Sequence, residues 1–373
     1  MEKITLNLKN KDSVCDVFAG RGLYPEIVKY VKEMNKSQNV IITDSKVEKL
    51  HGERLLNLLK EEGVASFMIS FPEGEKNKTR QTKATMEDEM FSNKCGRDTL
   101  VIALGGGVTG DMAGFVAGTY MRGIPVLQIP TTTIAIGDSS YGGKTAIDVP
   151  AGKNLIGVFH QPIAVFMDTD LLQTLDERNY ISGLVEIIKH GMIKDIDFYN
   201  FLKENIEIIS RPKNEGYNEI MGQVVMRNLL IKRDVVLEDQ RESNLRKILN
   251  YGHTLGHAVE KLSNFDLLHG EAIAIGIAAE AFFAYKAGVM PKEDYLEQKD
   301  ILESIGLSTK IPEYISTKEI LDLMRLDKKA RGGMPEFSLC KKNGQYAIFE
   351  NGEVAKRFSR EELEKWINEY SAL

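Results

Sequence analysis

Short, continuous apolar runs alternate with helical patterns along the first half of the chain. Five of the runs predict buried strands: NVIITD (39–44), ASFMISF (65–71), DTLVIALGGG (98–107), PVLQIP (125–130) and AVFMD (164–168). Between the first two lies KVEKLHGERLLNLLKEEG (46–63), an amphipathic segment that predicts a helix ending at Gly63. Strands that alternate with helices predict a parallel sheet covered on both faces.

The pattern changes near residue 178. Three long segments beyond it have helical periodicity and few strand signals: NYISGLVEIIKHGMI (179–193), YNEIMGQVVMRNLLIKRDVVLED (217–239) and HGEAIAIGIAAEAFFAYKAG (269–288). A later piece, QYAIFENGEVAKRF (345–358), is strand-like, with NG as its turn. The sequence therefore predicts an α/β domain with a parallel sheet over residues 1–177 and a mainly α-helical domain over residues 178–373.

Composition and charge narrow the class of protein. The chain has 373 residues and 41.8 kDa, enough for two or three domains. With 43% hydrophobic and 27% charged residues, it is predicted to fold rather than stay disordered. The longest apolar run, Ala272 to Tyr285, is too short to cross a bilayer and contains Glu280. A net charge of −6, without any block rich in Lys and Arg, excludes an ordinary nucleic-acid binder.

Neither export nor a disulfide framework is predicted. The first residues, MEKITLNLKNKD, lack the apolar core of a secretory signal. Cys15, Cys95 and Cys340 are odd in number and far apart, without the spacing of a metal site. We therefore expect reduced thiols in a cytoplasmic protein.

A glycine-rich turn follows the strand TLVIALGG. Gly105 to Gly110 fits the pattern G-x-G-x-x-G, and the helical segment from Asp111 follows directly. Such a turn lets the backbone approach a pyrophosphate and offers it the N–H groups of a helix start. A nucleotide site is one interpretation, and a tight turn without a ligand is the other. Asp44, at the end of an earlier strand, suits a ribose contact and a helix N-cap equally well.

Three of the six histidines lie within seventeen residues and predict a divalent metal site. His253 and His257 lie one turn apart on one helix face, and His269 opens the next apolar helix. Glu186 lies in the apolar helical segment GLVEIIKHG, where a buried carboxylate needs a partner. Two His and one Glu would leave positions open for substrate oxygens. Spacing alone chooses His253 and His257 as the pair, and core or capping histidines remain the alternative.

Several cations lie beside glycines or in apolar segments, although the chain is acidic overall. They are Arg122, Lys144, Lys153, Lys189, Lys232, Arg246 and the lysines of the Asp327-Lys328-Lys329 triplet. Together they predict an anionic substrate, most simply one that carries a phosphate and a carboxylate. For each residue taken singly, ordinary surface charge is an equal alternative.

Long motifs across almost the whole chain resemble the 3-dehydroquinate synthases of the sugar-phosphate cyclase family. The strongest are ALGGGVTGDMAGFVAGTYMRG (103–123), PTTTIAIGDSSYGGKTAIDVPAGKNLIGVFHQP (130–162), GLVEIIKHG (183–191), LNYGHTLGHAVE (249–260) and LHGEA (268–272). The resemblance implies a Rossmann-like N-terminal domain that binds NAD⁺ and a helical C-terminal domain that binds metal and substrate, with the active site between them. It also implies one Zn²⁺ (or Co²⁺) and the conversion of 3-deoxy-D-arabino-heptulosonate 7-phosphate to 3-dehydroquinate and phosphate.

The resemblance also implies roles for individual residues. The metal ligands would be Glu186, His253 and His269, so that His257 would face the substrate instead. The catalytic residues would be Lys144, Lys189, Lys232, Glu242, Arg246, Asn250 and His257, and further substrate contacts would come from Arg122, Asp138, Lys153, Asn154 and Lys328. NAD⁺ contacts would come from Asp44, Glu75, Lys78, Gly106, Gly107, Asp111, Thr131, Thr132, Lys144, Lys153 and Thr174. Family members are often dimers, so we expect a homodimer.

The chain departs from common family motifs at a few positions. Ile136-Gly137-Asp138 replaces the end of the usual LLAQVD run, Asp239-Gln240-Arg241-Glu242 replaces DERE, and Ile147-Asp148-Val149-Pro150 replaces VNHP. Asp148 thereby adds a charge near the substrate loop. Glu336 stands where a basic or apolar residue is commoner, which leaves the phosphate contact of the C-terminal segment open.

Three other functions are compatible with parts of the pattern. The nearest is another cyclase of the family, such as 2-deoxy-scyllo-inosose synthase or an epi-valiolone synthase, but Ser-Ser-Tyr-Gly-Gly-Lys144 favours dehydroquinate synthase. A metal-dependent alcohol dehydrogenase of the glycerol dehydrogenase type would not need so many cations. A binding-only homologue would not need Glu186, His253, His269 and Arg246 together.

Overall fold

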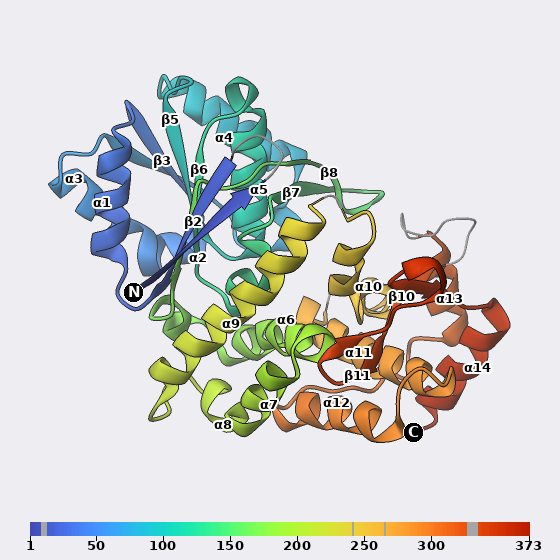
Figure 1. Ribbon diagram of the computed structural model, residues 1–373. Helices are drawn as coiled ribbons and strands as arrows, with labels where there is room; N and C mark the ends of the chain where they lie inside the picture. Colours follow the sequence, from blue (N-terminus) through green and yellow to red (C-terminus); the bar gives the residue numbers. More distant parts are fainter. Residues whose placement is uncertain (9–12, 241, 265, 327–334) are drawn as a thin grey trace. The chain divides into compact units, whose positions relative to one another are not determined.

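The computed structural model describes residues 1–8, 13–240, 242–264, 266–326 and 335–373 (Figure 1). The chain divides into two compact units, Met1–Asp176 and Glu177–Leu373. Each unit is described by itself below.

The first unit contains a seven-stranded, mostly parallel sheet with the strand order β1-β2-β9-β6-β5-β3-β4. Its strands are β1 (Glu2–Leu8), β2 (Ser13–Gly20), β3 (Gln38–Asp44), β4 (Ser66–Phe71), β5 (Thr99–Gly105), β6 (Val126–Pro130) and β9 (Ala164–Asp168). Only the edge strand β1 is antiparallel to its neighbour. All five strands predicted from apolar runs are confirmed. The β1–β2 pair was not predicted.

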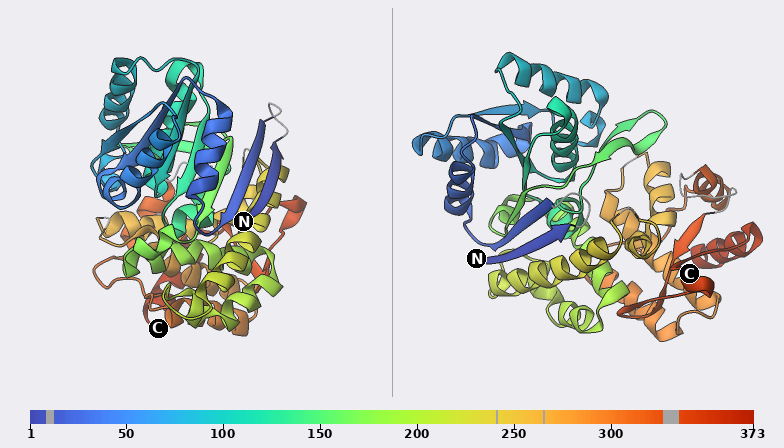
Figure 2. Two further views of the ribbon diagram at one scale, coloured as in Figure 1. Left: turned by 90° about the vertical axis from the view of Figure 1, so that its left-hand side faces the viewer. Right: turned by 45° about the horizontal axis from the view of Figure 1, so that its top comes forward.

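Helices cover both faces of this sheet (Figures 1 and 2). They are α1 (Tyr24–Met34), α2 (Ser45–Val47), α3 (Glu53–Glu61), α4 (Arg80–Ser92) and α5 (Gly107–Thr119). Ile41 and Ile102 pack in the cluster that includes α1 and α3, whereas Val40 and Val101 pack in the cluster that includes α4 and α5. Successive side chains of a strand point to opposite faces, so a sheet covered on both faces needs an unbroken apolar run.

The predicted helix over residues 46–63 is confirmed with an irregular middle. A π-helical turn, η1 (Glu48–Gly52), joins α2 to α3, and Gly63 takes a φ of 73° just beyond the helix end. The left-handed φ at Gly63 suits glycine because it has no Cβ.

A separate two-stranded antiparallel sheet joins β7 (Lys144–Val149) to β8 (Gly152–Phe159). The register shifts between Ile147 and Val149, so Asp148 lies at an irregularity next to the turn. This hairpin carries three predicted site residues: Lys144, Lys153 and Asn154.

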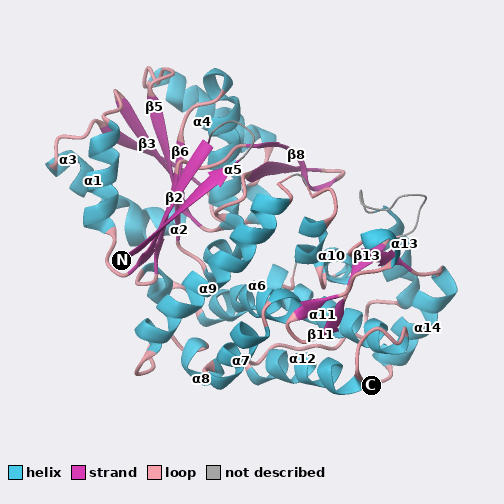
Figure 3. Cartoon of the chain, in the orientation of Figure 1, coloured by secondary structure: helices cyan, strands magenta, loops and turns pink. Residues whose placement is uncertain are grey.

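The second unit is mainly helical (Figure 3). Its helices are α6 (Glu177–Lys194), α7 (Ile196–Glu204), α8 (Ile206–Ile209), α9 (Tyr217–Glu238), α10 (His253–Leu262), α11 (His269–Lys286), α12 (Lys292–Ser304), α13 (Thr317–Leu326) and α14 (Arg360–Ser371). The three long helices predicted from periodicity are confirmed as α6, α9 and α11. The predicted fold class, an α/β unit followed by a helical unit, is also confirmed.

The strand-like segment 345–358 does not form a hairpin across its NG dipeptide. Its first part, β12 (Gln345–Tyr346), pairs with β11 (Cys340–Lys342), and its last part, β13 (Ala355–Arg357), pairs with β10 (Glu336–Ser338). The NG pair lies in a short 3₁₀ turn, Glu350–Gly352. Pairing with strands earlier in the chain therefore replaces the local turn that the dipeptide favours.

Helices α10 and α11 run antiparallel with their backbones in close contact. A Cβ at Gly276 would lie 1.9 Å from the carbonyl oxygen of Gly252, and one at Gly256 would lie 3.0 Å from that of Ala272. Glycine at these positions lets the two helices approach more closely than any other residue would allow. This contact fixes the distance between the starts of the two helices.

No helix within the described ranges is both long and apolar enough to cross a membrane.

The close contact of α10 and α11 predicts a large loss of stability for Gly276→Ala. The added methyl group would meet backbone rather than a flexible side chain, so we expect a cost of roughly 3 kcal/mol in the free energy of unfolding. Urea unfolding followed by circular dichroism measures this change. Gly222→Ala in α9 is the matched control, since nothing lies within 4 Å of a Cβ there. The control is expected to gain about 0.5–1 kcal/mol, and an equal response of the two variants would contradict the prediction.

Candidate active site

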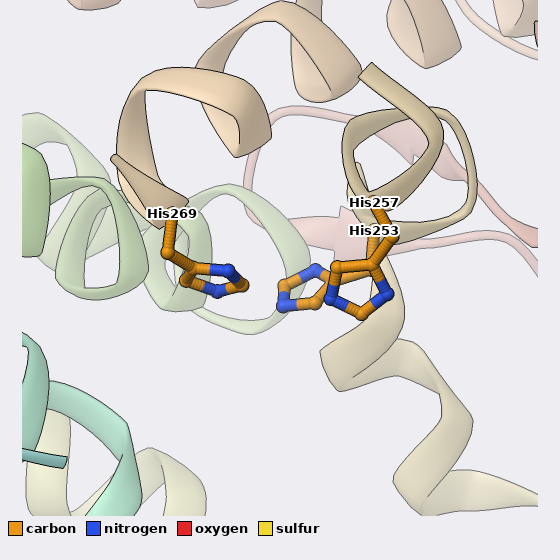
Figure 4. Close-up of side chains that lie close together, drawn as sticks. All are labelled: His253, His257 and His269. Carbon is orange, nitrogen blue, oxygen red and sulfur yellow. The ribbon is translucent and has the colours of Figure 1, made fainter. Parts of the chain in front are cut away.

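Three histidine side chains from α10 and α11 lie close together (Figure 4). His253 and His257 come from the first two turns of α10, and His269 is the first residue of α11. A nitrogen of each ring lies within 4.8 Å of a nitrogen of both others. The antiparallel helix pair thus gathers three imidazoles that lie up to sixteen positions apart in the sequence.

The carboxylate of Glu186, on α6, lies beside this cluster. Its Oε1 is 3.5 Å from Nε2 of His253 and 3.7 Å from Nε2 of His269, and the side chain is 1% exposed. Its Oε2 accepts a hydrogen bond from Lys189, whose Nζ also donates to the carbonyl of Leu249 at 2.6 Å. By contrast, Oε1 has no hydrogen-bond partner among the described residues.

The charges of these groups follow from their surroundings. Burial raises the pKa of Glu186, but the Lys189 ammonium and the imidazoles of His253 and His269 outweigh it and hold this pKa well below its usual range. Burial lowers the pKa of His253 well below its ordinary value, and the Lys189 cation adds to this effect. The His253 ring is therefore neutral and donates from Nδ1 to the carbonyl of Tyr251 at 3.0 Å. Its Nε2 lone pair is left directed at a carboxylate oxygen.

Two lone pairs that face each other across 3.5 Å call for a cation between them. Zinc bonds of about 2.0–2.2 Å in a tetrahedral site place ligand atoms roughly 3.3–3.6 Å apart. The separation of Glu186 Oε1 from Nε2 of His253, 3.5 Å, lies within that range, and its separation from Nε2 of His269, 3.7 Å, lies just above it. The buried oxygen without a hydrogen bond is the atom that a metal would satisfy. The donor set Glu186, His253 and His269 therefore fits a divalent metal.

A second carboxylate lies beside the other ring nitrogen of His269, Nδ1. Glu260, buried on α10, has its Oε2 3.6 Å from Nδ1 of His269. Burial lowers the pKa of His269, but the nearby carboxylates of Glu186 and Glu260 outweigh it and raise this pKa to about 9. A metal ligand whose other ring nitrogen contacts a carboxylate is oriented and made more basic by it.

His257 differs from the other two histidines. Its side chain is exposed, whereas His253 and His269 are partly buried. Spacing alone had paired His257 with His253, while the resemblance implied His269. The distances to Glu186 support His253 and His269, and the complete ligand set stays a prediction.

Around the cluster, the loop after α9 carries further predicted residues. Asp239 accepts hydrogen bonds from the backbone N–H groups of Ser243, Asn244 and Arg246 at 2.8–3.1 Å.

Within this loop, Glu242 takes a φ of 59° and accepts a hydrogen bond from Asn250. The Arg246 side chain is 3% exposed and donates to the carbonyl of Gln240 at 2.7 Å. Lys232, on α9, is likewise 3% exposed. The sequence had not assigned Asp239 a role.

In the first unit, the carboxyl ends of β3 and β5 bring the glycine-rich turn beside Asp44. The strands pair up to Ile42 and Ala103, two residues before Asp44 and Gly105. In the sheet, β4 lies on one side of β3, whereas β5 and then β6 lie on the other side. The strand order thus reverses between β3 and β5, and α/β sheets bind ligands at such a switch point. Asp44 caps α2, which is one of its two anticipated roles, and it also accepts a hydrogen bond from Thr109 at 3.3 Å. Its contact with a ribose stays a prediction. Next to the same turn lie Thr131, which donates its N–H to Gly105, and Thr132, whose Cγ2 lies 3.0 Å from a Cβ at Gly106.

Lys78 joins several of the predicted cofactor contacts. Its Nζ donates to Asp111 and Asn154, both at 2.6 Å, and the residue is 3% exposed. Burial lowers the pKa of Lys78, but the carboxylates of Asp111 and Glu75 outweigh it and raise the pKa, so the amine is charged. Glu75 in turn lies 3.4 Å from Nζ of Lys153.

Asp148 also belongs to this network. The sequence had shown it only as a departure from the common family motif and had not assigned it a contact. Its Oδ1 accepts the backbone N–H of Asn154 at 2.8 Å, while Asn154 has a φ of 53°. The sequence signal that could have indicated this role is the position of Asp148 just before the turn of the hairpin that carries Lys153.

The remaining predicted residues lie in short helical turns or at the start of a strand. Thr174 contacts Nε2 of His51 through its hydroxyl at 2.8 Å, and Lys144 is the first residue of β7. Asp138 lies in the π-helical turn Ala135–Ser139. Arg122 has a φ of 70°, as unusual for a non-glycine residue as that of Glu242, and such backbone strain concentrates at functional sites. Lys328 lies outside the described residues.

Comparison with known proteins identifies the family. A family model described as 3-dehydroquinate synthase N-terminal matches residues 68–182, and one described as 3-dehydroquinate synthase C-terminal matches residues 183–330. The chain belongs to the 3-dehydroquinate synthase family. Within this family, the 3-dehydroquinate synthase of Thermodesulfovibrio yellowstonii is 40% identical over 372 residues, which cover 99% of this chain and all of that protein.

Solved structures of two other synthases share the fold of this chain. A 2-deoxy-scyllo-inosose synthase complexed with carbaglucose-6-phosphate, NAD⁺ and Co²⁺ matches with a TM-score of 0.85 and 24% identity, covering 99% of this chain and 100% of that one. The 2-epi-5-epi-valiolone synthase of Streptomyces hygroscopicus, with NAD⁺ and Zn²⁺ bound, matches with a TM-score of 0.86 and 24% identity over 98% of both chains.

The Asp239 contacts predict a pH-dependent loss of stability for Asp239→Asn. Burial raises the pKa of Asp239, but the N–H groups of Ser243, Asn244 and Arg246 outweigh it and lower the pKa to about 2. The stabilisation is therefore complete above the unfolded-state pKa of about 3.9 and is lost as the pH falls through about 2. We expect a cost of about 1–3 kcal/mol at pH 7.

Urea unfolding of the wild type and the variant between pH 2.5 and 7 tests this dependence. The difference in unfolding free energy should be constant near neutrality and shrink below about pH 4. Asp322→Asn, which removes a half-exposed partner of Arg360, is the control and should cost less than about 1 kcal/mol. A difference for Asp239→Asn that stays constant down to pH 2.5 would contradict the assignment.

Proposed function

We propose that this chain is a 3-dehydroquinate synthase, a phosphate lyase of the shikimate pathway of aromatic amino acid biosynthesis. The reaction converts 3-deoxy-D-arabino-heptulosonate 7-phosphate to 3-dehydroquinate and phosphate by NAD-mediated oxidation, β-elimination, re-reduction and intramolecular aldol closure. The observation that carries the proposal is the buried Oε1 of Glu186, without a hydrogen bond and facing two histidines, in a chain of this family.

Residues of both units fit the two groups that the solved relatives contain. Glu186, His253 and His269 would hold Zn²⁺ or Co²⁺, and the carboxyl edge of the sheet, from Asp44 to the Gly106–Gly107 turn, would hold NAD⁺. When bound, these groups would supply Lewis-acid polarisation of substrate hydroxyls and reversible hydride acceptance. We accordingly assign NAD⁺ binding to residues 1–177 and metal and substrate binding to residues 178–373.

The cationic side chains would bind the two anionic ends of the substrate. Arg246 suits a carboxylate or phosphate through bidentate hydrogen bonds, because its planar guanidinium is held by the Gln240 carbonyl. Lys144, Lys153 and Lys232 would add positive charge without a fixed geometry. His257, exposed beside the metal cluster, would transfer protons near neutral pH.

We also propose where the enzyme is located and how it assembles. Its three cysteines are buried and unpaired, which suits a cytoplasmic protein. A homodimer is proposed from the resemblance to the family alone. The alternative activity is that of another sugar-phosphate cyclase, such as 2-deoxy-scyllo-inosose synthase, since its fold matches closely.

Phosphate release is the direct test of the activity. With 3-deoxy-D-arabino-heptulosonate 7-phosphate and catalytic NAD⁺, we expect phosphate and 3-dehydroquinate in equal amounts, no net NADH, and loss of activity with a chelator. Glucose 6-phosphate and sedoheptulose 7-phosphate are the controls for the related cyclases. Release from one of these controls, and none from the heptulosonate, would replace the proposed substrate.

The metal ligands can be separated from the substrate-facing histidine by two variants. His269→Ala should lose metal and activity together, because it removes one of three donors around Glu186. His257→Ala should keep its metal while activity falls, because its ring is exposed and outside that donor set. Elemental analysis of both purified variants measures metal content. Full occupancy in His269→Ala, or loss of metal in His257→Ala, would assign the ligands differently.

A further inference from the structure

A fully buried carboxylate lies within α11, a strongly apolar helix. Glu280 is 0% exposed on α11, where its neighbours are alanines, isoleucines and phenylalanines. Transfer of an ionised carboxylate out of water costs several kcal/mol unless hydrogen bonds compensate it. A side chain in such a place therefore needs specific partners.

Two partners of Glu280 are backbone donors at the start of α10. Its Oε2 accepts the N–H of Gly252 at 2.8 Å, and its Oε1 accepts the N–H of Leu255 at 3.1 Å. These N–H groups belong to the first turn of a helix, which has no acceptors of its own for them. The N-cap residue of α10 is Gly252, which has no side chain to fill that role. Glu280 thus caps α10 from the neighbouring helix and places a negative charge at the positive end of its dipole.

The capped turn carries a metal ligand. His253 is the first residue of α10, between the two N–H groups that Glu280 binds. The segment just before this turn is held by the bond from His253 Nδ1 to the Tyr251 carbonyl and by the bond from Lys189 to the Leu249 carbonyl. Because Gly276 packs against the Gly252 carbonyl one turn before Glu280, the carboxylate has little freedom to follow a displaced helix start.

We propose that Glu280 is a positioning residue of the metal centre, which fixes the first turn of α10 so that His253 is oriented before the metal binds. The inference rests on the metal site proposed above. In this arrangement each helix start meets a buried carboxylate of the other helix: Glu260 lies beside His269, and Glu280 lies beside Gly252.

Metal affinity of Glu280→Gln tests the proposal. The amide removes the charge and presents an NH₂ group to one of the two backbone donors. We expect the dissociation constant for Zn²⁺, measured by competition with a chromophoric chelator, to rise about tenfold to a hundredfold. The absorption bands of the Co²⁺ form should change as well, because the orientation of His253 changes.

Asp168→Asn is the matched control for this experiment. Asp168 is a buried carboxylate of the first unit that accepts backbone N–H groups of Gly22, Leu23 and Asp170. It should lose stability without a change in Zn²⁺ affinity or in the Co²⁺ spectrum. An unchanged affinity in Glu280→Gln would overturn the positioning role. A wild-type chain that binds neither metal would overturn the metal centre itself, and this proposal with it.

A measurement on the wild type covers the case in which Glu280→Gln does not fold. Hydrogen–deuterium exchange of peptides over residues 250–256 should be slow in metal-free protein and change by less than about twofold when Zn²⁺ is added, because Glu280 already binds the Gly252 and Leu255 amides. Fast exchange that becomes slow only with Zn²⁺ would show that the metal orders the turn, and would overturn the proposal.

Discussion

The site in the second unit depends on the buried negative charge of Glu186. At 1% exposure this carboxylate is stable only with positive charge close by, and Lys189 satisfies only one of its oxygens. The other oxygen faces His253 and His269, so the need to compensate one buried charge also creates the place for a metal. The Lys189 cation keeps Glu186 ionised, and burial together with this cation keeps His253 neutral; both states are those that a metal ligand requires.

The antiparallel packing of α10 and α11 places the histidines close to this buried charge. Close backbone contact at Gly276 fixes the spacing of the two helices, and buried carboxylates support the histidine-bearing start of each helix. The positions of the proposed ligands are therefore fixed by packing and capping that involve residues outside the proposed ligand set. Such supporting contacts decide how well a metal site is preorganised.

The first unit follows a different physical rule. Parallel strands end at one edge of the sheet, and there Asp44, the glycine-rich turn and Thr131 come together from three separate strands. Lys78 links this edge to the β7–β8 hairpin through Asp111 and Asn154. Several of these residues are charged and buried, so each of them is held by a partner of opposite charge or by an amide.

The sequence by itself determined the fold class and most of the chemistry. Apolar runs marked the buried strands, helical periodicity marked α6, α9 and α11, and the scarcity of histidine made the cluster in residues 253–269 conspicuous. Spacing alone paired His257 with His253, and not His269, because helical periodicity describes only neighbours on one helix. The pairing of β12 and β13 with earlier strands, the cap that Glu280 gives to α10, and the contact of Asp148 with Asn154 were decided by the tertiary structure. In each case the deciding contact joins chain segments through packing, and local sequence preferences carry no record of it.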